Sequence, residues 1–162
     1  MNKQEIYKFL NDNDIWHEIT EHQPIFNMEE AAQITLPYPE ADAKNLFVRD
    51  DKKRNYYLIT VNGDKKVNLK AFKEKYQTRS LSFASAESLL EILGLTPGSV
   101  SPFGLLNDTE RKVHFYIDED FTHSPGLIGI HPNENTATVF LKTCDLIEII
   151  KNHGNSVSFC RL

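Results

Sequence analysis

Residues 45–61 read NLFVRDDKKRNYYLITV, and this stretch decides the fold class. Two apolar and β-branched runs, 45–49 and 56–61, lie on either side of the charged segment 50–55. Such a pair of runs around a polar turn predicts a β-hairpin. The rest of the chain must then supply further strands and the helices that cover the sheet.

Helical patterns recur on both sides of this hairpin. Residues 3–11 place Ile6, Phe9 and Leu10 on one helical face. Capping residues and apolar spacing predict four more helices. These run from the N-cap Asn27 to Ile34, through the basic stretch with Leu69, Phe72 and Tyr76, from the cap Ser85 to Gly94 with Leu89, Leu90 and Leu93 buried, and from the cap Thr143 to Gly154.

Further strands are expected at 16–19, 113–117, 127–130, 136–141 and 157–160, with a turn-rich loop at 95–108 that ends in a strand. Strands in pairs with irregularly interspersed helices predict an α+β fold with a mixed, mostly antiparallel sheet. The chain has no repeats or linkers, so we expect one domain over residues 1–162.

Composition narrows the class of protein. The chain has 162 residues, 40% of them hydrophobic and 25% charged, and no run approaches the ~20 apolar residues of a membrane helix. Cys144 and Cys160 are too few for a disulfide framework or a metal site. These features predict a cytoplasmic protein that uses neither a membrane nor a cofactor.

The charge is unevenly distributed. The chain carries −5 overall, yet the segment from Lys44 to Arg79 has 11 Lys or Arg and 4 Asp or Glu. The remaining residues have 7 Lys or Arg and 19 Asp or Glu. An acidic body with one basic segment suits a polyanion that touches one edge of the molecule, although a solvated lysine-rich helix and hairpin would look similar.

Three local features are candidates for chemistry. Lys44 begins an apolar strand, where its ammonium can serve as a point charge for a phosphate or simply discourage edge-to-edge aggregation. Residues 94–104 read GLTPGSVSPFG, a rigid loop whose backbone N–H groups can bind an oxyanion, or a plain structural turn. His131 lies at a strand end, where it can titrate near neutral pH or serve only in packing.

The sequence also lacks several well-known signals. The six histidines show no metal-ligand spacing, so we expect no zinc. No GxSxG, P-loop or GxGxxG pattern is present, and no Cys–His pair has a supporting spacing. A hydrolase of this sequence would therefore work by positioning and polarisation rather than through a covalent nucleophile.

Taken together, four motifs in the same order resemble the YbaK/prolyl-tRNA-synthetase-associated editing domain family, and within it the branch of freestanding prolyl-tRNA editing proteins (ProX). They are EHQP at 21–24 with MEEA at 28–31, AKNLFVRD at 43–50, LSFAS at 81–85 with PGSVSPF at 97–103, and HP at 131–132 with NTAT at 135–138. Their span covers about 120 residues of the chain.

This resemblance implies a strongly curved, barrel-like sheet surrounded by helices, and an enzyme that hydrolyses the ester of mischarged alanyl-tRNA(Pro). By position, Lys44 would engage the 3′ end of the tRNA and Gly98 N–H the ester carbonyl, while His131 would order the attacking water with Asn45. The substrate's own ribose hydroxyl is expected to assist. Further substrate-binding candidates are Leu46, Ile34, Ser99, Ser101 and Pro102, with Leu36 beside them in an apolar pocket.

A basic set is expected to meet phosphates of the acceptor stem: Lys52, Lys53, Arg54, Lys65, Lys66 and Lys70. Prolyl-tRNA synthetase is a possible protein partner under the resemblance. Three alternatives remain: a deacylase for cysteinyl-, seryl- or threonyl-tRNA, a non-catalytic module that binds tRNA or a synthetase, and a small-molecule binding protein.

Overall fold

The computed structural model describes residues 1–162, with the side chain of Met28 left out of the description. Its larger sheet has five strands in the order β4-β2-β3-β5-β8. The predicted hairpin forms its centre, because β2 and β3 pair antiparallel with Asn45 opposite Thr60. The strands are β2 (Ala43–Asp50), β3 (Tyr56–Asn62), β4 (Leu81–Phe83), β5 (Val113–Asp118) and β8 (Val157–Cys160).

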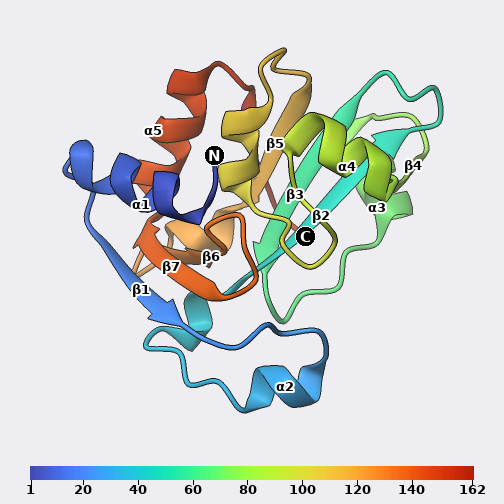
Figure 1. Ribbon diagram of the computed structural model, residues 1–162. Helices are drawn as coiled ribbons and strands as arrows, with labels where there is room; N and C mark the ends of the chain where they lie inside the picture. Colours follow the sequence, from blue (N-terminus) through green and yellow to red (C-terminus); the bar gives the residue numbers. More distant parts are fainter.

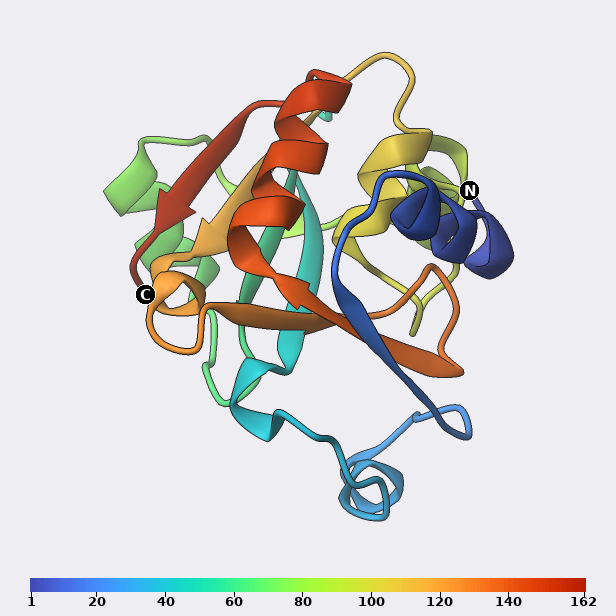
Figure 2. The same cartoon turned by 90° about the vertical axis from the view of Figure 1, so that its left-hand side faces the viewer.

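A second, three-stranded antiparallel sheet lies beside the first (Figures 1 and 2). Its order is β1-β7-β6, with β1 at His17–Glu21, β6 at Leu127–Ile130 and β7 at Ala137–Lys142. One parallel bridge, between Asp42 and Gly129, joins the start of β2 to β6 of the second sheet. This bridge brings the chain just before β2 next to β6.

Five α-helices and three 3-10 helices cover or connect the sheets. The α-helices are α1 (Lys3–Asp12), α2 (Met28–Ala32), α3 (Leu69–Tyr76), α4 (Ala86–Leu93) and α5 (Thr143–His153), and the 3-10 helices are η1 (Pro39–Ala41), η2 (Pro102–Asn107) and η3 (Glu119–Thr122). Helix α2 stands apart from both sheets, on an arm that follows β1 (Figures 1 and 2). In the described structure, no helix has the length and apolar character needed to cross a membrane.

The larger sheet is covered on both faces because successive apolar residues of its strands point to opposite faces of the sheet. Phe47 and Leu58 are partners across the hairpin and belong to one buried cluster, which includes Phe103 of η2. Val48 is on the other face of β2, in a second cluster with Phe72 of α3. Side chains of β2 therefore point alternately toward α4 and η2 or toward α3.

The α+β class and the mixed, mostly antiparallel pairing are confirmed, since four of the six strand pairs are antiparallel. The expected single barrel-like sheet is replaced by two strongly twisted sheets that do not close. The bounds predicted for four of the helices and for the hairpin strands agree with the structure to within two residues, and the basic stretch forms the predicted helix as α3.

Three local predictions were wrong. Leu90 is 59% exposed, and Ile92 takes the buried position on α4. Thr143 is the first residue of α5 rather than its cap, and its hydroxyl donates to the Phe121 carbonyl at 2.7 Å. The loop at 95–108 ends in the 3-10 helix η2 rather than in a strand, because Pro102 begins a tight turn capped by Ser101.

Candidate active site

The loop from Gly98 to Pro102 is tied to the end of β6. Ser101 is fully buried, and its hydroxyl donates to the His131 carbonyl at 2.6 Å while it accepts from Phe103 N–H at 3.2 Å. In Figures 1 and 2 this loop lies beside the connection between β6 and β7. Ser101 therefore holds the loop against His131, a role that places its hydroxyl out of reach of a substrate.

Gly98 is the exposed corner of this loop. Its φ of +92° lies in the region that favours glycine, and the following N–H, of Ser99, closes the turn onto the Thr96 carbonyl at 3.0 Å. Within the described part of the chain, the Gly98 N–H donates to no protein acceptor. Gly98 thus offers a backbone donor to a ligand, with Ser99 and Pro102 buried behind it.

His131 is held as a neutral acceptor. Its Nδ1 lies 3.0 Å from the Ala137 carbonyl oxygen, which can only accept, so Nδ1 carries the proton and Nε2 keeps its lone pair. Burial lowers the pKa of His131, and the neighbouring His22 lowers it further, against the opposing effect of the Ala137 hydrogen bond. At neutral pH the ring can therefore accept a hydrogen bond from water or from a hydroxyl.

A second histidine, His22, accompanies it and has no predicted chemical role beyond its place in the EHQP motif. The His22 and His131 rings meet edge to face with centroids 6.2 Å apart. His22 Nδ1 lies 2.8 Å from the Gln23 carbonyl, which leaves Nε2 to accept from the Thr138 hydroxyl at 3.0 Å. His22 is thereby fixed between the two strands that lead to the site.

Asn135 fastens the arm that carries α2 to this site. It is 7% exposed, its Nδ2 donates to the Ile25 carbonyl at 2.7 Å, and its Oδ1 accepts from Ile25 N–H at 3.3 Å. The arm borders an open cavity of about 610 Å³ whose lining includes His22, Phe26 and Ile34. The structure thus places the predicted pocket residue Ile34 in the cavity that His22 also lines.

Lys44 and Asn45 lie near the start of β2 and point to opposite faces of it. Asn45 shares a face with Phe47 and accepts from the Thr60 hydroxyl at 2.6 Å, on the side of η2 and the Gly98 loop. Lys44 is exposed on the other face, opposite Val61, and its ammonium donates to the Lys65 carbonyl at 3.1 Å. Leu46 also turns to that face and packs against the second buried cluster, away from the cavity.

The Asp42–Gly129 bridge still brings Lys44 toward His131. The bridge is parallel, and Lys44 and His131 each follow a bridged residue by two positions. The start of β2 and the end of β6 therefore run in the same direction to the same edge. The ammonium of Lys44 itself lies on the face opposite Asn45, where it donates to the Lys65 carbonyl.

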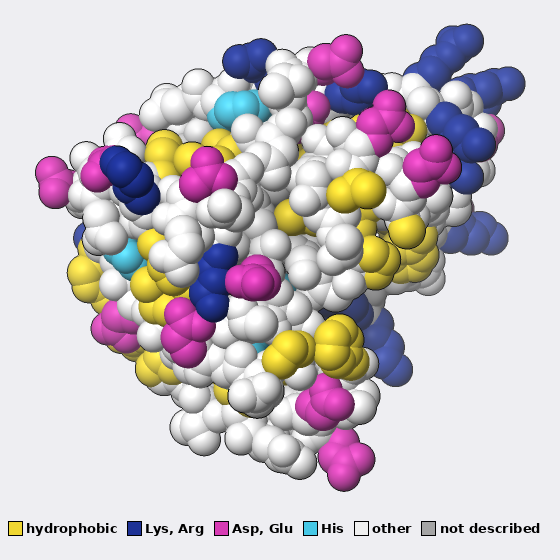
Figure 3. All heavy atoms as spheres, viewed as in Figure 1, with side chains coloured by type: hydrophobic (Ala, Val, Ile, Leu, Met, Phe, Trp, Pro, Cys, Tyr) yellow, Lys and Arg dark blue, Asp and Glu magenta, His cyan; other side chains and the backbone are white. Residues whose placement is uncertain are grey.

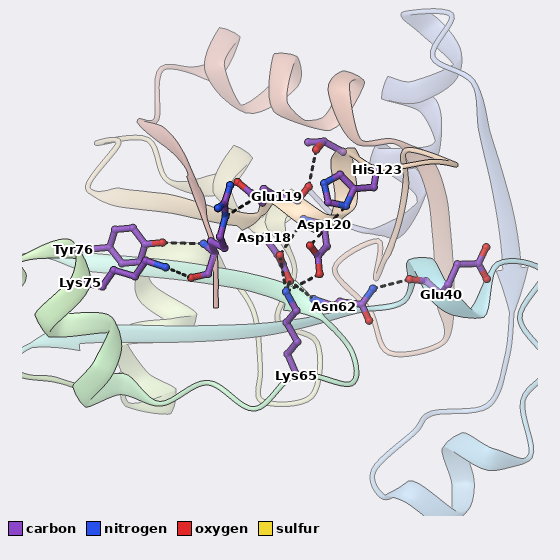
Figure 4. Close-up of polar contacts among 11 residues, drawn as sticks. Glu40, Asn62, Lys65, Lys75, Tyr76, Asp118, Glu119, Asp120 and His123 are labelled. Atoms are coloured by element: carbon purple, nitrogen blue, oxygen red, sulfur yellow. Dashed lines mark hydrogen bonds and ion pairs between the residues drawn. The ribbon is translucent and has the colours of Figure 1, made fainter.

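Lys65, one of the predicted tRNA contacts, is already paired. Its ammonium lies 2.8 Å from carboxylate oxygens of both Asp118 and Asp120, and Asp118 is fully buried (Figure 4). Burial alone would lower the pKa of Lys65, but the hydrogen bonds to the two carboxylates raise it above its ordinary value. Lys65 therefore fixes the turn after β3. Its backbone carbonyl, in the same turn, accepts the hydrogen bond from the Lys44 ammonium.

The other predicted tRNA contacts do not form one patch. Lys52, Lys53 and Arg54 are exposed at the turn between β2 and β3, about 20 Å from Lys44 at ~3.4 Å per strand residue. Lys and Arg side chains gather over this turn at the upper right of Figure 3. Lys66 and Lys70 are exposed near the other end of the hairpin, before and within α3. The basic residues thus flank the hairpin at both ends.

The site's chemistry comes from His131 and from backbone donors. In the described part of the molecule, His, Cys, Asp and Glu side chains form no group of three that could hold a metal ion. The Gly98 loop can donate a hydrogen bond to a carbonyl oxygen, and His131 can accept a proton beside it, next to the cavity.

Comparison with known proteins places this arrangement in a family. Residues 22–149 match the model of the aminoacyl-tRNA editing domain. The chain is 38% identical to the prolyl-tRNA editing protein ProX of Acetoanaerobium sticklandii, over 95% of this chain and 93% of that protein. It is 33% identical to prolyl-tRNA synthetase associated domain-containing protein 1 of Bos taurus, over 85% of this chain and 82% of that protein.

A solved structure has the same fold. It is described as a candidate trans-editing enzyme for prolyl tRNA synthetase, and it superposes with a TM-score of 0.71 at 18% identity, covering 100% of this chain and 98% of its own. The family model spans the Gly98 loop, His131 and Lys44, the residues that surround the site. The chain belongs to the aminoacyl-tRNA editing domain family.

Proposed function

We propose that this protein is a freestanding editing enzyme that hydrolyses the ester of alanyl-tRNA(Pro). The observation that carries the proposal is the pairing of the open Gly98 N–H with His131, joined through the buried Ser101 hydroxyl. The 38% identity to a prolyl-tRNA editing protein along nearly the full length of both chains supports it.

In the proposed reaction, water attacks the ester carbon and the carbonyl oxygen takes up negative charge facing the Gly98 N–H. The bond between the acyl carbon and the ribose oxygen then breaks, and the ribose oxygen receives a proton as the acid is released. His131 Nε2 is available to accept a hydrogen bond from the water or from the neighbouring ribose hydroxyl. A single preorganised backbone donor of this kind contributes about 3 kcal/mol to such a step.

Lys44 is proposed to bind a phosphate at the 3′ end of the tRNA. Lys44→Ala should lower kcat/KM for deacylation of alanyl-tRNA(Pro) roughly 10- to 100-fold, since a hydrogen bond to a charged group is worth about 1.5–3 kcal/mol. Loss of radiolabelled alanine from the tRNA measures the rate. Because the side chain is exposed, thermal unfolding should be unchanged.

The matched control is Lys151→Ala, which removes an exposed lysine on α5. It should keep wild-type activity. Equal activity of the Lys44 and Lys151 variants would remove Lys44 from the mechanism, and a wild-type protein without turnover would contradict the proposed function itself.

The turn between β2 and β3 is proposed to meet phosphates further along the acceptor stem. Replacing Lys52, Lys53 and Arg54 together with alanine should weaken tRNA binding. It should also make the fall of log K with log salt less steep by about 2, because each phosphate that the variant no longer neutralises accounts for up to ~0.9 of the slope. Filter binding between low and moderate salt measures the slope. An unchanged slope, or the same change in a Lys142→Ala control, would exclude this turn.

A further inference from the structure

We propose that the exposed ring of Phe26 is a stacking platform for the terminal base of the tRNA, a subsite that rests on the function proposed above. Phe26 is 74% exposed, the highest value among the large hydrophobic side chains that the structure leaves exposed. Exposing an aromatic ring of this size forgoes most of the free energy that its burial would supply. Its position next to the site suggests that the ring serves a ligand.

The ring lies directly beside the proposed carbonyl site. Phe26 Cε1 is 3.9 Å from the position that a Cβ atom would occupy at Gly98. Phe26 also lines the 610 Å³ cavity with His22 and Ile34. In an aminoacyl nucleoside the ester and the base are attached to the same ribose. A carbonyl held by the Gly98 N–H therefore places the base within one ribose of the Phe26 ring.

The backbone that carries the ring is fixed. The Phe26 N–H donates to a Glu30 carboxylate oxygen at 2.9 Å, and both backbone groups of Ile25 bond to the buried Asn135. Asn27 then caps α2 through Glu30 N–H at 2.8 Å. These contacts hold in place the backbone that carries the exposed ring, as a preorganised binding surface requires.

Charge indicates that a base, rather than a phosphate, reaches this arm. The chain has no Lys or Arg between Lys8 and Lys44, and it has eight Asp or Glu there. Glu30, whose carboxylate holds the Phe26 N–H, lines the same cavity. An acidic surface repels phosphates, whereas stacking on an aromatic ring requires no charge and accepts any base. The phosphates of the RNA backbone would then bind to the lysines on the hairpin side.

A cycle of two changes tests the subsite: Phe26→Leu in the protein, and removal of the terminal base from alanyl-tRNA(Pro) to leave an abasic 3′ ribonucleotide. Each change alone should lower kcat/KM roughly 5- to 100-fold, mainly through KM, because base–aromatic stacking is worth about 1–3 kcal/mol. The two changes together should cost little more than one, and Phe26→Tyr should restore the base dependence.

Phe159→Leu, at a 48% exposed position on the edge strand β8, is the matched control and should keep the wild-type response to base removal. A Phe26→Leu variant that still loses as much activity as wild type on base removal would overturn the subsite. A changed preference among acyl groups with unchanged base dependence would also overturn it, by making Phe26 a wall of the amino-acid pocket. Absence of deacylation by wild type on the intact tRNA would instead reject the proposed function, from which the subsite follows.

Discussion

Replacing Gly98 with alanine should lower kcat for deacylation of alanyl-tRNA(Pro) by roughly 10²–10³-fold, the loss typical of removing one oxyanion donor. An added Cβ would have room, since its nearest neighbours would be Asn135 Nδ2 at 3.7 Å and Phe26 Cε1 at 3.9 Å. The backbone would not tolerate it, because φ is +92°. An L-residue there costs about 1–2 kcal/mol, so the loop is expected to turn and redirect its N–H groups.

Gly126→Ala is the control for this change. Gly126 has a φ of +71°, and an added Cβ would meet nothing nearer than the His123 carbonyl oxygen at 4.0 Å. It precedes β6 at the end opposite His131, so the backbone strain should appear as lost stability without lost activity. Near-wild-type turnover by Gly98→Ala would show that this loop does not bind the carbonyl.

Asp118→Asn should lower the free energy of unfolding by about 2–4 kcal/mol, somewhat less than breaking a fully buried ion pair because Asp120 would still bind Lys65. The fully buried Asp118 carboxylate accepts from the Lys65 ammonium, from Asn62 N–H at 3.2 Å and from Asp120 N–H at 3.0 Å (Figure 4). The amide cannot supply the charge or all of these acceptors. Urea unfolding measures the loss.

Asp120→Asn is the matched comparison, since that carboxylate is 45% exposed and binds the same ammonium. It should cost no more than about 1 kcal/mol. The Asp118 change should also reduce deacylation, because the turn that it anchors supplies the Lys65 carbonyl to Lys44. Equal and small losses from the two substitutions would show that this ion-pair network does not stabilise the turn.

The elements that the sequence predicts well are those defined by local periodicity. Both runs of the hairpin are apolar, and three of the five predicted helices have a predicted cap or stop that the structure also uses, namely Asn27, Ser85 and Gly154. Local signals say little about which side of a helix is buried. Leu90 fits the apolar pattern of α4 as well as Ile92 does, and only the packing of α4 against η2 distinguishes them.

Tertiary pairing also determines where the predicted site residues lie. Nothing near Lys65 in the sequence shows its partner, because Asp118 reaches it through the parallel pairing of β3 with β5, 53 residues further along the chain. Similarly, the side chains of β2 alternate between the two faces of the sheet, so Lys44 and Leu46 lie on the face opposite Asn45. Only the structure shows which of these faces carries the site. Phe26 carries no sequence signal, since its exposure depends on where the arm is fastened by Asn135.

The most direct test of the proposed editing activity is deacylation by the wild-type protein of tRNA(Pro) charged with alanine, cysteine or proline, alongside seryl- and threonyl-tRNA. We predict rapid release of alanine from alanyl-tRNA(Pro), with prolyl-tRNA(Pro) left intact. Preferential release of cysteine would keep the editing chemistry and change the substrate. Failure to release any of these amino acids, by a protein that is folded and binds tRNA, would contradict the central claim.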